Sequence, residues 1–295
     1  MNQFNTPISR RELIARSSVL GAGTIALGAL VVACGSDSSK LPAGTKVVKR
    51  FPDGALVPGP LRLPVSLADK NSILSGDDLP ATLTAKMVDL KTGKDVLAGL
   101  TATKHAGTAP QPYWPFHAEV NEPGIYKLVV DGADPDGAGF QLSAANEVSV
   151  PVPGDQLPSV ETATFDNPLG IDPVCTLTPK PCPLHSISLS VALKSGKPVA
   201  YLLGTPAHCT TGTCAPALEE LLDVAKEFAN KAVFIHAEIY SDKAATQIAP
   251  PVAAYYMTYE PALFVTNAKG ILVDRLDAVF DGAEIRASLK KAGIN

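Results

Sequence analysis

Short runs in which apolar and polar side chains alternate recur between residues 45 and 152. Alternation with a period of two is typical of a β-strand that buries one face. Clusters of Asp, Gly and Pro separate these runs, as expected for turns between successive strands. The pattern predicts strands at 61–67, 81–88, 116–120, 126–130 and 141–150, and short strands at this spacing predict an antiparallel β-sandwich.

The hydrophobic period changes after about residue 175. Leu218, Leu221 and Phe228 lie on one face of a predicted helix that follows an apolar run at 198–203. Asp281 and Glu284 have the spacing of a capping box and predict the start of a last helix. The remaining expected elements are helices at 188–194 and after 251, and strands at 232–240, 261–265 and 271–273. Helices and strands that alternate in this way predict an α/β domain.

Proline is concentrated between these two regions. Five prolines fall between 151 and 174, a composition that favours an extended linker. We therefore expect a two-domain protein. The predicted divisions are a β-sandwich at 45–152, a linker at 153–174 and an α/β domain at 175–295.

The first 33 residues have the composition of an export signal rather than of a folded domain. The segment Ser9-Arg10-Arg11-Glu12-Leu13-Ile14 resembles a twin-arginine signal. Val31-Val32-Ala33-Cys34-Gly35 resembles a bacterial lipobox, which implies that Cys34 is lipidated and that 34–44 is a tether. This predicts a lipid-anchored protein on the extracytoplasmic face of the cell membrane. An ordinary secretory signal or an uncleaved anchor is the alternative.

Charge and cysteine content agree with this interpretation. The net charge is −4 and no basic run is present, which argues against nucleic acid as a partner. If Cys34 carries lipid, four of the five cysteines remain, in two local pairs. Outside the cytoplasm such pairs are usually oxidised.

One cysteine pair lies in a loop between an apolar strand and an amphipathic helix. The segment His208-Cys209-Thr-Thr-Gly-Thr-Cys214, the segment Tyr259-Glu260-Pro261 and the hairpin Asn267-Ala-Lys-Gly270 together resemble the thioredoxin fold. The leader at 186–198 resembles that of membrane-tethered thioredoxin-like proteins. In the first domain, the segment at 121–130 resembles the entry to a late strand of immunoglobulin-like domains, where a tyrosine, here Tyr126, bonds back to the backbone.

The resemblance to thioredoxins implies roles for three residues. Cys209 would attack a substrate disulfide, Cys214 would resolve the mixed disulfide, and Pro261 would follow a cis peptide bond beside them. The chain departs from the family in two ways. Four residues separate the cysteines instead of two, and His208 replaces the tryptophan that usually precedes the first cysteine.

The wider spacing has a geometric consequence. Residues five apart on a continuous helix have Cα atoms roughly 8–9 Å apart, whereas a disulfide requires less than about 7 Å. Cys209 and Cys214 therefore cannot both lie on the helix if they bond to each other. Gly212 would let the loop turn back and place Cys214 at the helix N-terminus, where the helix dipole would favour its thiolate. This leaves open which cysteine attacks.

Two other polar residues flank the pair. His208 could stabilise a neighbouring thiolate as a cation, or it could simply point to solvent. Glu260 could oppose thiolate formation or carry a proton, or it could lie exposed on the surface.

The other pair, Cys175 and Cys182, encloses a short proline-containing loop at the entrance of the α/β domain. We expect a structural disulfide here. A metal site built from this pair and His185 would need a fourth ligand, and the sequence offers no evident one; His236 is expected to be a packed or surface residue in a strand. No metal and no cofactor are expected.

Three functions are compatible with these patterns. The first is a membrane-anchored, extracytoplasmic thiol–disulfide oxidoreductase that acts on cysteines of exported proteins or on a redox partner. The second is a redox-inert binding or assembly lipoprotein with structural disulfides. The third is a copper-handling chaperone using the two thiolates and His208, which is disfavoured because no histidine follows His236.

Overall fold

A computed structural model describes residues 41–295 of the chain. The predicted export signal at 1–33, the lipidation site at Cys34 and most of the 34–44 tether lie outside the described residues. Within 41–295, no helix combines the length and the apolar composition needed to cross a membrane.

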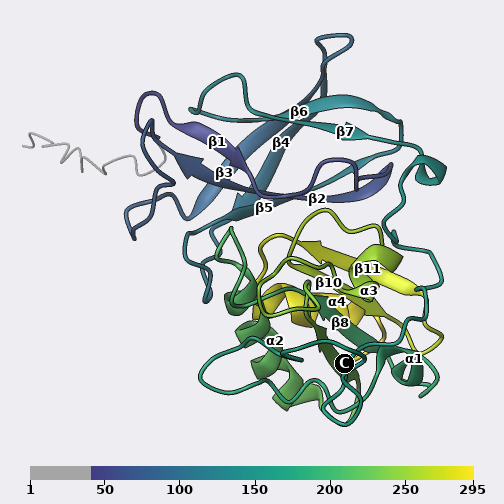
Figure 1. Ribbon diagram of the computed structural model, residues 1–295. Coiled ribbons are helices and arrows are strands. Elements are labelled where there is room, and N and C mark those ends of the chain that lie inside the picture. The colour runs from purple at the N-terminus through teal and green to yellow at the C-terminus, as the bar shows by residue number, and fades with distance from the viewer. Residues whose placement is uncertain (1–40) are drawn as a thin grey trace, which may run out of the picture. The chain divides into compact units, whose positions relative to one another are not determined.

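Residues 46–142 form two antiparallel sheets (Figure 1). One sheet has the order β1-β2-β5 and the other has the order β4-β3-β6-β7. The strands are β1 (Lys46–Lys49), β2 (Gly59–Ala68), β3 (Thr82–Asp89), β4 (Asp95–Thr103), β5 (Trp114–Val120), β6 (Gly124–Val130) and β7 (Ala138–Leu142).

A single hydrophobic core takes side chains from both sheets. Leu63, Val65 and Leu67 alternate along β2 and are fully buried, and Met87 and Leu128 are buried to the same extent on the other sheet. Trp114 is also fully buried, and its indole N–H donates to Pro80 O at 3.1 Å. The alternation along the strands thus selects the faces that enclose the core.

The sequence pattern does not predict two of the strands, and it predicts a third that extends too far. In β4, most side chains are exposed because the strand lies at the edge of its sheet, so no alternation is visible. The short β1 also lies at a sheet edge. The strand expected at 141–150 ends with β7 at Leu142, and a 3₁₀ turn, η1 (Ala145–Glu147), follows it.

The C-terminal part is an α/β fold around a four-stranded sheet of order β11-β10-β8-β9 (Figure 1). Strands β8 and β9 are parallel, whereas β10 is antiparallel to both β8 and β11. This strand order, with a helix after β8 and a cis proline before β10, agrees with the thioredoxin-like arrangement expected from the sequence. Its elements are α1 (Leu189–Ala192), β8 (Val199–Leu203), α2 (Cys214–Phe228), β9 (Val233–Ala237), α3 (Pro250–Ala254), β10 (Ala262–Thr266), β11 (Leu272–Asp277) and α4 (Gly282–Lys291).

Hydrophobic cores cover both faces of this sheet. Leu202 on β8 packs in the core that also contains residues of α2 and α4, whereas its neighbour Tyr201 packs in the core that contains residues of α1 and α3. Every residue of β8 and β10 is buried. These strands therefore appear in the sequence as continuous apolar runs, as expected for central strands covered on both sides.

The proline-rich segment between the two parts packs against the α/β part. Leu157 and Ile171 are buried in the core on the α1 and α3 face. The Leu157 N–H donates to Gly270 O at 3.0 Å, and the Gly154 N–H donates to Leu272 O at 2.8 Å. The segment expected to be a linker is thus hydrogen-bonded along the β10–β11 hairpin.

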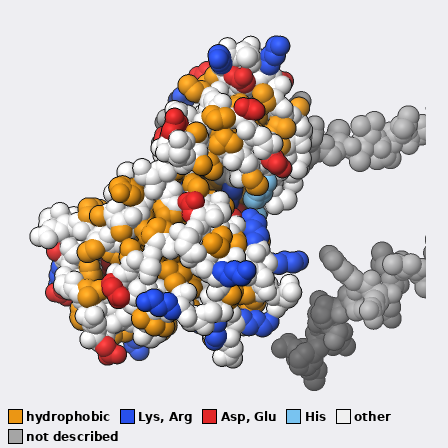
Figure 2. Space-filling view, turned by 90° about the vertical axis from the view of Figure 1, so that its right-hand side faces the viewer, with side chains coloured by type: hydrophobic (Ala, Val, Ile, Leu, Met, Phe, Trp, Pro, Cys, Tyr) orange, Lys and Arg blue, Asp and Glu red, His pale blue; other side chains and the backbone are white. Residues whose placement is uncertain are grey.

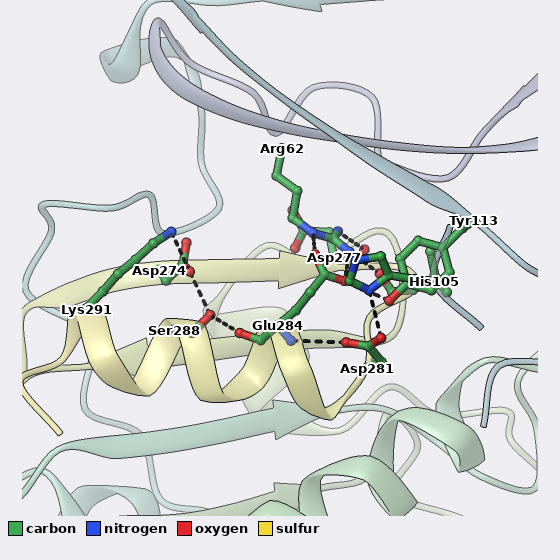
Figure 3. Close-up of polar contacts among 10 residues, drawn as sticks. Arg62, His105, Tyr113, Asp274, Asp277, Asp281, Glu284, Ser288 and Lys291 are labelled. Atoms are coloured by element: carbon green, nitrogen blue, oxygen red, sulfur yellow. Dashed lines mark hydrogen bonds and ion pairs between the residues drawn. The ribbon is translucent and has the colours of Figure 1, made fainter. Parts of the chain in front are cut away.

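Buried polar contacts join the all-β part to α4 (Figure 3). The Arg62 guanidinium on β2 donates to both carboxylate oxygens of Glu284, at 2.6 and 2.7 Å, and the Tyr113 hydroxyl donates to Glu284 at 2.7 Å. His105 Nδ1 lies 2.7 Å from Asp281 Oδ2. His105, which looks isolated in the sequence, therefore belongs to this contact.

The expected capping box at the start of α4 forms only in part. The Asp281 side chain accepts from the Glu284 N–H at 3.0 Å, as predicted. The Glu284 carboxylate, however, bonds to Arg62 and Tyr113 rather than to the cap backbone. Because a buried carboxylate needs a charged partner, Glu284 serves the contact between the two parts.

Elsewhere the surface is mixed. On the face drawn in Figure 2, apolar, basic and acidic side chains are interspersed over both parts of the chain. This agrees with the mildly acidic composition, with 25 Lys and Arg against 29 Asp and Glu in the whole sequence.

Candidate functional site

The loop between β8 and α2 brings Cys209 and Cys214 together. Cys214 is the first residue of α2, and Thr213 before it is the N-cap residue. Gly212 has φ +67°, a left-handed conformation that turns the chain back. As a result the Cys214 N–H donates to Cys209 Sγ at 3.2 Å. Cys209 therefore lies outside the helix, with its sulfur against the helix N-terminus.

In this arrangement the partial positive charge of the helix N-terminus stabilises the thiolate of Cys209. Its sulfur accepts an N–H that has no partner within the helix, and it also contacts the Thr211 hydroxyl at 3.2 Å. Hydrogen bonding from the Cys214 side chain is the largest effect that lowers the pKa of Cys209, to about 5. Cys209 is partly exposed. We expected the helix N-terminus to favour a thiolate at Cys214. This expectation is wrong, because the N–H group at the start of the helix donates to the sulfur of Cys209 and not to that of Cys214.

Cys214 has the opposite properties. Its side chain is buried, and its Sγ lies 3.3 Å from Glu260 Oε2, so its single thiol proton can be donated either to Cys209 or to Glu260. Hydrogen bonding to Cys209, and then burial and the charge of Glu260, raise the pKa of the Cys214 thiol far above its usual range. The pair thus consists of an accessible thiolate and a buried thiol.

Glu260 lies partly buried beside the thiols. Its Oε2 also accepts from the Thr205 N–H at 3.0 Å. Burial, and then the charge of Cys209, raise the pKa of Glu260 to about 7. A carboxyl group with this pKa can accept a proton from Cys214 and release it at neutral pH.

Pro261 follows Glu260 through a cis peptide bond, as the resemblance implied. A Cβ at Gly204 would lie 3.3 Å from Pro261 Cβ and 3.5 Å from Cys214 Cβ. The absence of a side chain at Gly204 therefore allows β8, the proline and the cysteine to approach one another.

His208 is partly exposed, and its ring lies edge-on to Tyr240, with centroids 6.0 Å apart. The hydrogen bonds to Cys209 come from Cys214 and Thr211. The role of His208 as a cation beside the thiolate remains a prediction.

A second cluster of thiols and imidazoles was missed in the sequence. Cys175, Cys182, His185 and His236 are all buried, and one ligand atom from each lies within 4.8 Å of the others. His236 on β9 provides the fourth side chain that the sequence did not reveal. Its position in an apolar strand gave no signal, because only the fold brings β9 to the loop at 175–185. The disulfide expected between Cys175 and Cys182 remains a prediction.

Comparison with known proteins yields limited similarity. No family model matches the chain, and no curated protein matches it. Among solved structures, the chain is similar to the crystal structure of a thiol:disulfide interchange protein of the thioredoxin family from Chlorobium tepidum TLS. The sequence identity is 20% and the TM-score is 0.34, and the match covers 48% of this chain and 96% of that chain. The arrangement of the α/β part is instead defined by its strand order and by the cis bond between Glu260 and Pro261.

Proposed function

We propose that this protein is a thiol–disulfide oxidoreductase in which Cys209 attacks and Cys214 resolves. The observation that carries the proposal is the division of properties within the pair. Cys209 is accessible and has a pKa of about 5, whereas Cys214 is buried and shares its proton with Glu260. A pair that formed only a structural disulfide would not require that one cysteine be activated as a thiolate.

In the reducing direction, the Cys209 thiolate attacks one sulfur of a substrate disulfide. A mixed disulfide forms and the other substrate sulfur leaves as a thiolate. Cys214 then passes its proton to Glu260 and attacks Cys209 Sγ, which releases the second substrate thiolate. Two electrons move from the protein dithiol to the substrate, and the protein is left with a Cys209–Cys214 disulfide. The reverse sequence oxidises a substrate dithiol.

Reduction of insulin with a small thiol as electron donor tests this chemistry. Cys209→Ser should abolish turnover, whereas Cys214→Ser should accumulate a mixed disulfide with insulin that mass spectrometry detects. The double variant Cys209→Ser/Cys214→Ser, which leaves Cys175 and Cys182 in place, is the control for disulfide exchange at the second cluster.

Measurement of the reduction potential of the pair distinguishes the proposal from the redox-inert alternative. A working couple should lie near about −200 mV, and a value well below about −300 mV would mark a structural bridge and contradict the proposal. The absence of a trapped species in Cys214→Ser would contradict it as well.

We further propose that lipid at Cys34 anchors the chain on the extracytoplasmic face of the membrane. The lipobox-like sequence ending at Cys34 supports this. In cells fed labelled palmitate, the wild type should carry label and sediment with membranes, and Cys34→Ala should do neither. Label retained by Cys34→Ala would contradict the proposal.

The all-β part is proposed to be an immunoglobulin-like module that serves as a spacer or binds a partner. Its two sheets around one core support this, as does the Tyr126 hydroxyl, which donates to Glu122 O at 3.0 Å as a tyrosine corner does.

A further inference from the structure

Four buried side chains converge behind the redox site. Cys175, Cys182 and His185 come from the loop before α1, and His236 comes from β9. Their exposed fractions are 5%, 1%, 1% and 0%. The redox proposal makes no use of them.

The contacts around His236 exceed what hydrogen bonding can satisfy. His236 Nε2 lies 2.9 Å from Gly204 O, which can only accept, so Nε2 carries a proton and a neutral ring has one lone pair, on Nδ1. Three atoms converge on this Nδ1: His185 Nε2 at 3.1 Å, Cys182 Sγ at 3.5 Å and Cys175 Sγ at 3.8 Å. One lone pair cannot accept well from three donors, whereas a cation among the four atoms would use all of them.

The same distances fit a tetrahedral metal site. With metal–sulfur bonds of about 2.3 Å and metal–nitrogen bonds of about 2.0–2.1 Å, neighbouring ligand atoms of a tetrahedron lie roughly 3.3–3.8 Å apart. The three distances to His236 Nδ1 fall close to this range. The ligand spacing of six residues between the cysteines and two between Cys182 and His185 leaves the loop free to fold around the ion.

We propose that Cys175, Cys182, His185 and His236 bind a structural Zn²⁺ ion. Two sulfur and two nitrogen ligands in a tetrahedron are a donor set that suits zinc. Two thiolates and two neutral imidazoles balance the charge of a dication, so burial of the complex isolates no net charge. All four ligands come from the protein and all are buried, which defines a closed structural site rather than an open catalytic one.

Neighbouring contacts already orient the ligands. The bond to Gly204 O fixes the ring of His236 with Nδ1 toward the cluster, as outer contacts do for metal-binding histidines. Glu238 accepts from the N–H and the hydroxyl of Thr176, next to Cys175, at 2.6 and 2.9 Å. The Thr176 hydroxyl in turn accepts from the Ala207 N–H at 3.1 Å. The zinc site would therefore hold the loop that leads to Cys209.

Metal analysis of the full chain tests the proposal. The protein is reduced anaerobically, incubated with Zn²⁺ alone, freed of excess metal and analysed by elemental mass spectrometry and X-ray absorption. We expect one zinc per chain, with two sulfur neighbours near 2.3 Å and two nitrogen neighbours near 2.0–2.1 Å. Substitution of Co²⁺ for zinc should give the visible bands of a tetrahedral thiolate complex.

Matched variants locate the ion. Cys209→Ser/Cys214→Ser should retain zinc, whereas Cys175→Ser/Cys182→Ser should lose it to the level of the buffer. The second variant could fail to fold, so His236→Gln serves as a further test. It keeps both thiols and should bind cobalt with altered visible bands or not at all. Loss of zinc from Cys209→Ser/Cys214→Ser, or no uptake by the fully reduced wild type, would overturn the proposal. A Cys175–Cys182 disulfide that re-forms in the presence of Zn²⁺ and excludes it would do the same.

Discussion

At the scale of single residues, the two thiols of the candidate site differ because only one of them lies on the helix. Cys214 begins α2 and donates its N–H, and Cys209 accepts it from outside. The exposed sulfur is therefore the one that the unpaired N–H groups stabilise as an anion.

This asymmetry predicts how fast each cysteine is alkylated. The rate of carboxymethylation at Cys209 should rise with a midpoint near pH 5 and reach its plateau by neutral pH, because only the thiolate reacts. Buried Cys214 should stay unmodified. Peptide mapping after brief exposure to iodoacetate measures both rates.

A pair of variants separates the side-chain hydrogen bond from the helix contribution. Cys214→Ala removes the side-chain donor and should move the Cys209 midpoint upward, while Cys214→Ser keeps a donor and should move it less. Equal midpoints in the two variants would contradict the assignment of the side-chain hydrogen bond as the main cause.

Glu260 predicts a pH dependence of stability. Its pKa is raised to about 7 in the folded protein, so the folded state favours the protonated carboxyl. The contribution is fully present below the pKa of the unfolded chain, near 4.5, and is lost as the pH rises through about 7. Glu260→Gln, which cannot ionise, should therefore gain stability relative to the wild type over this interval.

Urea denaturation of the reduced proteins between pH 4 and 8 measures the difference. The gap between Glu260→Gln and the wild type should widen up to about pH 7 and then level off. Glu219→Gln, which removes the same charge from an exposed position on α2, is the matched control and should show no such widening.

At the scale of elements, the turn before α2 depends on one glycine. No atom lies within 4 Å of a Cβ placed on Gly212, so a substitution there meets backbone strain alone. Gly212→Ala should lower the free energy of unfolding by about 1–2 kcal/mol, because an L-residue with a Cβ is disfavoured in the left-handed region. Gly212→Asn should cost less, since Asn tolerates this conformation. Denaturant titrations measure both, and equal stability of Gly212→Ala and the wild type would refute the argument.

The success of sequence-based prediction also differs between elements. The central strands and α2 could be predicted because burial on both faces, or on one helical face, leaves a strong apolar pattern. Edge strand β4 left none, because most of its side chains face solvent.

The candidate site could be predicted only where its residues are close in sequence or match a family pattern. Cys209, Cys214, Glu260 and Pro261 were found in this way. Two features depend on three-dimensional contacts that no local pattern encodes. One is the hydrogen bond from the Cys214 N–H to the Cys209 sulfur, and the other is the proximity of His236 to Cys175 and Cys182.

At the scale of the whole described chain, the all-β part directly supports the helix that carries Cys214. The Thr108 N–H donates to Glu220 at 2.8 Å and its hydroxyl donates to Pro216 O at 3.0 Å, both within α2. Together with the Arg62–Glu284 pair, these contacts make the two parts dependent on each other. We therefore expect residues 41–295 to unfold cooperatively.

The Arg62–Glu284 pair provides the test of this dependence. Their side chains are only 10% and 9% exposed, so Arg62→Met leaves Glu284 as a buried, uncompensated charge. Loss of one partner of such a pair typically costs about 3–5 kcal/mol, whereas replacement of both by apolar residues of similar size is often nearly neutral. Arg62→Met should therefore be strongly destabilised, and Arg62→Met/Glu284→Met should recover much of the loss. In calorimetry, the single variant should show the two parts melting separately and the wild type should show one transition. A wild type that melts in two steps, or a double variant no more stable than Arg62→Met, would mean that the ion pair does not couple the all-β part to the α/β part.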